Sequence, residues 1–308
     1  MELKVIVIVG PTCSGKTSLS LLTAEKINSE IISADSRQFY KFLDIGTAKP
    51  TQNEVEKIKH HLLDFLNPNE DYNASKFEKD AINIISELHR NCKIPIVVGG
   101  SGLYIKALVD GIFDEVDTNE NYRTELLELK KKHGNNFLYE LLEKNDPITA
   151  KNLLPQNWKR IIRALEVYHI TGKPIWKFYE NQKRDINFKF YQFGLNWNRE
   201  ILYLNIEKRV DEMITVGLVD EVKNILKMGY DKQINSLNTV GYKEIIDFLD
   251  GNITLDRAIE LIKRNTRRYA KRQLTWFRKD ERIKWFDVEK KDQLFEISDR
   301  IVRDLNKS

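Results

Sequence analysis

The sequence predicts an α/β fold, with helices flanking a parallel β-sheet and an all-helical insertion interrupting the chain. Short apolar runs alternate with helix-patterned segments up to about residue 110, which is typical of parallel βαβ units. Within this part, the stretch GPTCSGKT, Gly10–Thr17, lies between an apolar run and a helical pattern. From Glu115 to Arg184 helical patterns dominate, and no good strand separates them.

The expected elements of the first part follow directly from its apolar spacing. Each strand is a short apolar run, and each helix repeats apolar residues at helical intervals. Ser75 is expected to be the N-cap of one of these helices. Strands are expected over 4–9, 30–36, 61–66 and 94–100, and helices over 18–27, 75–91 and 103–111.

The remaining elements divide the chain into two expected domains. The insertion spans 115–186, with helices over 120–134, 135–145 and 157–172. A strand is expected again over 188–195, followed by further helices that end with a long basic one. Residues 1–114 and 187–308 would then form one catalytic core.

Composition excludes several classes of protein. The chain has 308 residues, 41% of them hydrophobic, and a net charge of +4. No apolar run reaches the ~18–20 residues that span a bilayer, so no membrane association is expected. The two cysteines, Cys13 and Cys92, have no metal-ligand spacing. A cytoplasmic protein is therefore expected.

The stretch Gly10–Thr17 fits the phosphate-binding pattern G-x-x-x-x-G-K-[ST]. Its glycines allow backbone N–H groups to converge on phosphate oxygens at the N-terminus of the following helix. Lys16 would reach the outer phosphate, and Thr17 would ligate Mg²⁺ or a phosphate oxygen. The pattern in this context predicts a P-loop NTPase-like core.

Phosphate binding alone does not decide the reaction. P-loop hydrolases usually place a metal-organising Asp after a second buried strand, but the apolar run 94–98 leads into Gly99, Gly100 and Ser101. Asp35 instead lies at the end of the strand that comes after the first helix, at the same edge of the sheet as the loop. From this pattern alone, Asp35 is equally well explained as a turn residue.

Several stretches together resemble the tRNA dimethylallyltransferase family, also called tRNA isopentenyltransferases. The block SADSRQFYKFLDIGTAKP, residues 33–50, is the most specific of them. The sequence has no C-terminal zinc-finger spacing, unlike some eukaryotic relatives, so it resembles the bacterial type. The other matching stretches are GPTCSGKT, HHLLDF, IPIVVGGSGLY, RALEVYHITGKP, VGYKEI and KRQLTWFR.

The resemblance implies that the loop holds the diphosphate of dimethylallyl diphosphate and that carbon, not phosphate, is transferred. The acceptor would be the exocyclic amine of the adenosine just 3′ of the anticodon. Asp35 matches the general base of the family, Arg209 an arginine that contacts the diphosphate, and Thr12 and Thr17 threonines near the leaving oxygen. The implied diphosphate-binding residues are Gly10, Pro11, Thr12, Cys13, Ser14, Gly15, Lys16 and Thr17.

Three positions depart from the usual pattern of the family. Cys13 stands where a small residue such as Ala is common, and Ser101 stands where Thr is common. Both changes are nearly isosteric, so little effect is expected. Lys243 replaces a frequent Arg and would contact phosphate without a bidentate fork.

A basic surface is expected near the C-terminal end. Residues 263–279 include eight basic residues and no acidic one, which favours RNA backbone contact over a solvated helix. The target base would be turned out of its stack into the site. The implied tRNA-binding residues are Asp35, Ser36, Arg37, Gln38, Ser101, Arg123, Lys159, Arg160, Ile161, Ile162, Arg163, Asn238, Thr239, Val240, Gly241, Tyr242, Lys243, Arg267, Lys271 and Arg272.

Three other functions compete with transfer to tRNA. A small-molecule P-loop kinase would consume a nucleotide. A prenyltransferase acting on free adenine nucleotides would not need the basic segment. A non-catalytic RNA-binding protein would not need Lys16, Thr17 and Asp35. The expected partners are the tRNA anticodon stem-loop and dimethylallyl diphosphate, with Mg²⁺ as cofactor and a monomeric protein.

Overall fold

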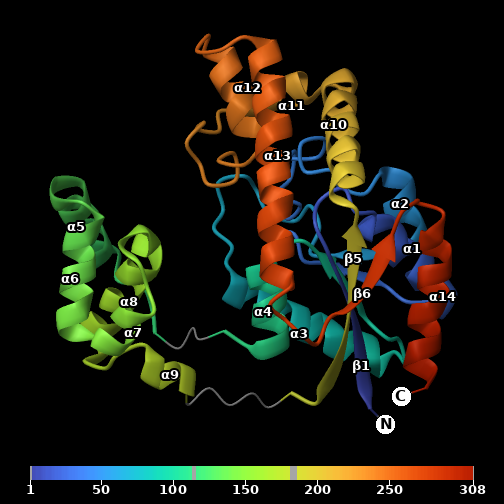
Figure 1. Cartoon of the computed structure of the whole chain (residues 1–308), viewed down its shortest axis with the longest axis horizontal. Helices are drawn as coiled ribbons and strands as arrows, with labels where there is room; N and C mark the ends of the chain where they lie inside the picture. The colour runs from blue at the N-terminus through green and yellow to red at the C-terminus, as the bar shows by residue number, and fades with distance from the viewer. Residues whose placement is uncertain (1, 113–115, 181–185, 308) are drawn as a thin grey trace. The chain divides into compact units, whose positions relative to one another are not determined.

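The computed structural model describes residues 2–112, 116–180 and 186–307 (Figure 1). Contacts divide the chain into two compact units. The first comprises Met1–Asp110 and Asn187–Ser308, and the second comprises Gly111–Ile186. The expected first residue of the insertion, Glu115, lies outside the described residues.

The first unit is built on a six-stranded sheet with the order β3-β2-β4-β1-β5-β6. Every pair of neighbouring strands is parallel, which confirms the predicted sheet. The order places β1 between β4 and β5 in the middle of the sheet. The strands are β1 (Leu3–Val9), β2 (Ile31–Ser33), β3 (His60–His61), β4 (Ile96–Gly99), β5 (Phe188–Trp197) and β6 (Lys284–Val288).

Side chains of β1 alternate between two hydrophobic clusters, because successive residues of a strand point to opposite faces. Val5 and Val7 belong to one cluster, and Ile6 and Ile8 to the other. Helices α1 (Lys16–Ile27) and α14 (Gln293–Asn306) lie side by side over the isoleucine face (Figure 1).

The valine face is covered by a larger group of helices, and this group includes the long basic one, α13. Figure 1 shows α3 and α4 beside the sheet and α10 to α13 extending beyond it. Their bounds are α3 (Ala74–Arg90), α4 (Gly102–Asp110), α10 (Arg199–Val216), α11 (Leu218–Lys227), α12 (Tyr242–Leu249) and α13 (Leu255–Phe277), while the short α2 spans Gln52–Lys57.

All the regular elements described in the second unit are helices, and the unit has its own core. Glu166 is fully buried there and accepts hydrogen bonds from Arg123 (3.0 Å) and Arg163 (2.8 Å). These two ion pairs compensate for the burial of the carboxylate. The elements are α5 (Glu120–His133), α6 (Asn135–Asn145), α7 (Pro147–Lys151), the 3₁₀ turn η1 (Pro155–Asn157), α8 (Trp158–Thr171) and α9 (Trp176–Glu180).

Three expectations about the elements were wrong. Asn73, not Ser75, caps α3, because the Asn73 side chain accepts the backbone N–H groups of Ser75 and Lys76. The strand expected over 61–66 is only the two-residue β3. The basic helix is not the last element, since β6 and α14 follow it. Among the described helices, none combines the length and apolarity needed to cross a membrane.

Candidate active site

A cavity of about 430 Å³ lies at the carboxyl edge of the sheet, where β1, β2 and β4 end. Its volume falls in the ~300–1,000 Å³ range of small-molecule sites. The walls come from seven segments of the first unit. They are Thr12–Ser18, Asp35–Gln38, Gly46–Ala48, Val98–Gly99, Asn238–Gly241 with Lys243, positions of α10 (Ile206, Arg209, Val210 and Met213), and positions of α13 that include Ile262, Tyr269, Arg272 and Gln273.

Cavity size alone does not locate the site. A hollow of about 540 Å³ beside α4 and the end of α13 is larger, but its lining includes no residue of the phosphate loop. The smaller cavity unites that loop with Asp35 and Arg209. We therefore assign the candidate active site by its chemistry.

The backbone of the phosphate loop has the expected turns. Gly15 has a φ of 87° and Cys13 a φ of 62°, and such left-handed positions let successive N–H groups point inward. α1 begins at Lys16, so its positive N-terminus faces the same space. The Ser14 hydroxyl is buried with no protein partner among the described residues, as expected of a loop built to hold a polar ligand.

Two side chains from distant elements hold this loop in place. The Trp197 indole N–H, at the end of β5, donates to the Ser14 carbonyl at 2.9 Å. Gln273 of α13 accepts from the Thr12 N–H at 2.8 Å and donates to the Gly100 carbonyl at 2.9 Å. A methyl group at Gly100 would overlap the Gln273 amide. Neither residue is predicted from the sequence as part of the site, because neither belongs to the loop motif.

Lys16 lies in the wall of the cavity and donates a 2.6 Å hydrogen bond to the Pro11 carbonyl. Desolvation lowers the pKa of its ammonium group to about 8. Asp35 and Cys13 raise this pKa and so oppose the effect of desolvation, whereas Arg209 lowers it further. Gly10 and Pro11 are buried and do not line the cavity. They therefore shape the backbone of the loop on the side away from the cavity.

The lowered pKa of Lys16 predicts a pH dependence of alkyl diphosphate binding. Lys16 is protonated below about pH 8, so its attraction for the anion is present there and is lost as the pH rises further. Terminal phosphates ionise near pH ~6, so the ligand charge is constant in this range. Calorimetry without Mg²⁺ should show that the affinity decreases above pH 8, by up to about tenfold for each pH unit. An identical profile in Lys16→Met would contradict this assignment.

Asp35 lies two residues beyond the end of β2 and in the cavity wall, as the parallel topology predicts. Its Oδ1 accepts the Arg37 N–H at 3.0 Å. The next residue, Ser36, donates its N–H to the Ser101 hydroxyl at 3.0 Å. The structure therefore brings Asp35 into one cavity with Thr12, Thr17 and Arg209, the other proposed catalytic residues.

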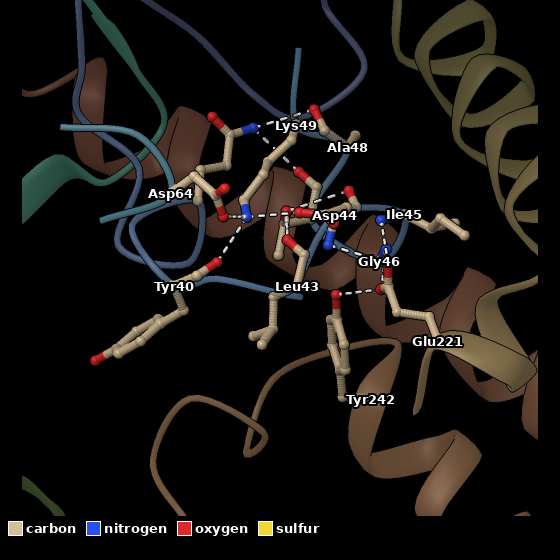
Figure 2. Close-up of polar contacts among 12 residues, drawn as sticks. Tyr40, Leu43, Asp44, Ile45, Gly46, Ala48, Lys49, Asp64, Glu221 and Tyr242 are labelled. Atoms are coloured by element: carbon tan, nitrogen blue, oxygen red, sulfur yellow. Dashed lines mark hydrogen bonds and ion pairs between the residues drawn. The ribbon is translucent and has the colours of Figure 1, made fainter. Parts of the chain in front are cut away.

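Most of the 238–243 segment lines the same cavity, but Tyr242 does not. Tyr242 is 0% exposed, so the prediction that its side chain contacts tRNA is wrong. Its hydroxyl instead donates to Glu221 of α11 at 2.6 Å, and Figure 2 shows it directed at that carboxylate. Ser101 is also buried and bonded within the protein.

The basic stretch of the insertion divides between surface and core. Lys159 and Arg160 are exposed, but Ile161 and Ile162 are 0% and 4% exposed. The prediction that these two isoleucines contact tRNA is wrong for their side chains, which pack in the core of the second unit. Arg123 and Arg163, as described above, bind the buried Glu166.

Acidic residues of α10 partly neutralise the basic helix α13. Lys263 pairs with Asp211 at 2.6 Å and Arg267 with Glu207 at 2.7 Å. Lys271 and Arg272 are exposed, and Arg272 also lines the cavity. A phosphate contact by Arg267 would have to compete with Glu207, whereas Lys271 and Arg272 are accessible to an RNA backbone.

A parallel sheet with a phosphate-binding loop and a carboxylate at its carboxyl edge defines a P-loop-type core. Residues 38–280 match the family described as IPP transferase. The tRNA dimethylallyltransferase of Carboxydothermus hydrogenoformans is 47% identical over 304 residues, which cover 98% of this chain and 97% of that protein. The chain belongs to the IPP transferase family, and the resemblance noted in the sequence is confirmed.

Solved structures show the same fold. A full-length tRNA isopentenylpyrophosphate transferase from Bacillus halodurans is 39% identical, with a TM-score of 0.73, and the match covers 99% of this chain and 98% of that one. A eukaryotic dimethylallyltransferase, studied while acting on tRNA, is 31% identical with a TM-score of 0.82. That match covers 97% of this chain and 77% of the eukaryotic one.

Proposed function

We propose that the protein transfers the dimethylallyl group of dimethylallyl diphosphate to the exocyclic amine of the adenosine 3′ of the anticodon in tRNA. The observation that carries this proposal is that Lys16 and Asp35 line one cavity, together with the phosphate loop. The names of the relatives at 39–47% identity support the same activity.

The phosphate side of the cavity suits a diphosphate leaving group. Breaking the allylic C–O bond leaves its electron pair on a diphosphate oxygen, where negative charge accumulates. The loop N–H groups, Lys16 and Arg209 face this region and would stabilise that charge. The Ser14 hydroxyl, which has no protein partner among the described residues, adds a further polar group.

The helix α10 offers an apolar surface for the allyl group. Ile206, Val210 and Met213 recur at helical spacing and line the cavity, on the same helix as Arg209. Ile262 of α13 and Val98 of β4 add to this surface. An apolar wall next to cationic groups fits a ligand with a branched hydrocarbon and a charged diphosphate, and it would exclude water from a carbocation-like centre.

Asp35 supplies the proton acceptor that the amine requires. The adenine nitrogen forms the new bond to the allylic carbon and must lose a proton. A carboxylate within reach of that nitrogen accepts the proton and completes the transfer. The Arg37 N–H bond to Oδ1 orients this carboxylate and leaves Oδ2 for the substrate.

Mg²⁺ is part of this proposal. Mg²⁺ sites commonly use one or two protein oxygens with substrate phosphates and water. The described residues contain no group of three or more His, Cys, Asp or Glu that could hold a metal ion, which fits a site completed by the diphosphate. The Thr17 hydroxyl would hold the ion and Asp35 lies in the same cavity. The bound ion would neutralise charge on the departing diphosphate.

The tRNA would contact exposed basic residues of both units. Lys271 and Arg272 of α13 are accessible on the first unit, and Lys159 and Arg160 on the second. Phosphate contacts of this kind would offset the cost of extruding the target adenosine. An enzyme with this substrate works in the cytoplasm, where tRNA is modified, and we propose that it acts as a monomer.

The test is transfer of labelled dimethylallyl groups by the purified protein. We expect label in unmodified tRNA with Mg²⁺ and without ATP, and one diphosphate released for each group transferred. A matched tRNA with guanosine in place of the target adenosine should remain unlabelled. Consumption of ATP would instead favour the kinase, and preferential labelling of free adenosine monophosphate would favour the nucleotide prenyltransferase.

A further inference from the structure

The loop 44–48 forms one wall of the cavity through Gly46, Thr47 and Ala48. The Gln38 amide donates to the carbonyls of Thr47 and Ala48, at 3.1 Å in each case. Gln38 lines the cavity too, and it lies three residues beyond Asp35. The position of the loop therefore helps to fix Gln38, which lines the same cavity as the proposed base Asp35.

Glu221 of α11 binds this loop through an unusual number of donors. Its Oε2 accepts the N–H groups of Asp44 (3.0 Å) and Ile45 (2.7 Å), and its Oε1 accepts the N–H of Gly46 (3.1 Å). Oε1 also accepts the Tyr242 hydroxyl (Figure 2). Three consecutive N–H groups on one carboxylate are charge-assisted bonds that fix a loop strongly.

Tyr242 extends this connection to the other wall of the cavity. Asn238–Gly241 and Lys243 line the cavity, and Tyr242 stands between them in sequence. A methyl group at Gly46 would overlap the Tyr242 ring, so ring and loop are in close contact. Burial raises the pKa of Tyr242 well above its usual value, so the hydroxyl keeps its proton and donates to Glu221.

We propose that Glu221 is a positioning residue for the tRNA-facing side of the cavity, because its carboxylate joins the 44–48 loop to the 238–243 segment. This inference rests on the proposed function. Among the described residues, the phosphate loop instead forms hydrogen bonds with Trp197 and Gln273. Loss of Glu221 should therefore disturb the adenosine side and leave the diphosphate side intact.

Lys49 holds the 44–48 loop independently of Glu221. Its side chain is only 7% exposed and pairs with Asp44 and Asp64, at 2.6 Å each (Figure 2). These ion pairs join the two ends of the loop, at Asp44 and Lys49, to each other and to Asp64, and none of them involves Glu221. We therefore expect Glu221→Gln to displace the loop locally rather than unfold the protein.

Glu221→Gln is the main variant. A carboxylate is purely an acceptor, whereas an amide presents an NH₂ group to two of the four donors. We expect kcat/KM for tRNA to fall about tenfold or more, with the dissociation constant for dimethylallyl diphosphate within about twofold of wild type. Hydrogen exchange at the amides of residues 44–46 should accelerate, and this rate reports directly on the hydrogen bonds between Glu221 and the loop.

Two further variants complete the experiment. Tyr242→Phe keeps the ring and removes one donor, so a smaller loss in the same direction is expected, and the double variant should be no worse than Glu221→Gln. Asp220→Asn, on the same helix with a 77% exposed side chain, is the matched control and should behave as wild type.

The outcomes separate this inference from the proposed function. Wild-type kcat/KM for tRNA in Glu221→Gln, or equal weakening of both substrates, would overturn the positioning role while the activity stands. A wild-type protein that transfers nothing to tRNA would overturn the proposed function and this role with it. Slow exchange at residues 44–46 in Glu221→Gln would show that the position of the loop does not depend on the carboxylate, which also overturns the inference.

Discussion

Replacing Asp35 with asparagine should reduce kcat for transfer to tRNA by about 10²–10⁴-fold, the contribution typical of a general base. Asparagine keeps an oxygen that accepts the Arg37 N–H, so the turn after β2 survives. It cannot take up the amine proton. Dimethylallyl diphosphate should bind no more weakly at pH 6.5, because the substitution removes a carboxylate from the cavity. Asp35 raises the pKa of Lys16, which is about 8 in the wild-type protein, so the comparison is made well below that pH to keep Lys16 protonated in the variant.

The matched control is Asp231→Asn. Asp231 is exposed and accepts the N–H of Gln233 at 2.7 Å, two residues further on, in the same way that Asp35 binds Arg37. It does not line the cavity, so its variant should turn over normally. Single-turnover kinetics distinguish chemistry from product release. If Asp35→Asn keeps kcat within about threefold of wild type, Asp35 is not the proton acceptor.

The parts of the site that could be predicted from sequence are those in which a short segment determines its own conformation. The eight residues Gly10–Thr17 supply the turns, the N–H donors and the lysine, and the flanking strand and helix orient them. Asp35 could be placed because parallel strands present their carboxyl ends at one edge. Neither inference needs a contact with a distant part of the chain.

The supports of the site could not be predicted, because their partners are far apart in sequence. Trp197 binds a residue 183 positions away, and Gln273 binds one 261 positions away. Glu221 reaches back 175 to 177 positions to the 44–48 loop. Each of these side chains is ordinary in its own helix or strand, and only tertiary packing gives it a role.

The errors in the predicted tRNA contacts have a different cause. The resemblance implies tRNA contact for the whole stretch from Lys159 to Arg163, in which two isoleucines lie between the basic residues. A helix of 3.6 residues per turn divides such a stretch between faces. In α8 the isoleucines point into the core, while Lys159 and Arg160 remain outside.

Replacing Lys16 with methionine should impair both binding and chemistry, unlike the Asp35 variant. Lys16 would touch the diphosphate before and during its departure, so removing it weakens the ground state and the transition state together. We expect kcat to fall about 10²–10³-fold, the cost of losing one preorganised charge donor. Affinity for dimethylallyl diphosphate should fall as well, and its decline above pH 8 should disappear with the titrating group.

The melting temperature of Lys16→Met distinguishes a loss of binding and turnover from misfolding. Desolvation holds the pKa of Lys16 below its ordinary value, so at pH 7 its charge is less favourable in the folded protein than in the unfolded chain. Methionine has a similar length and no charge, and the melting temperature of Lys16→Met should be equal to or above that of wild type. A lower melting temperature with unchanged diphosphate affinity would mean that Lys16 serves the fold of the loop through Pro11 and not the leaving group.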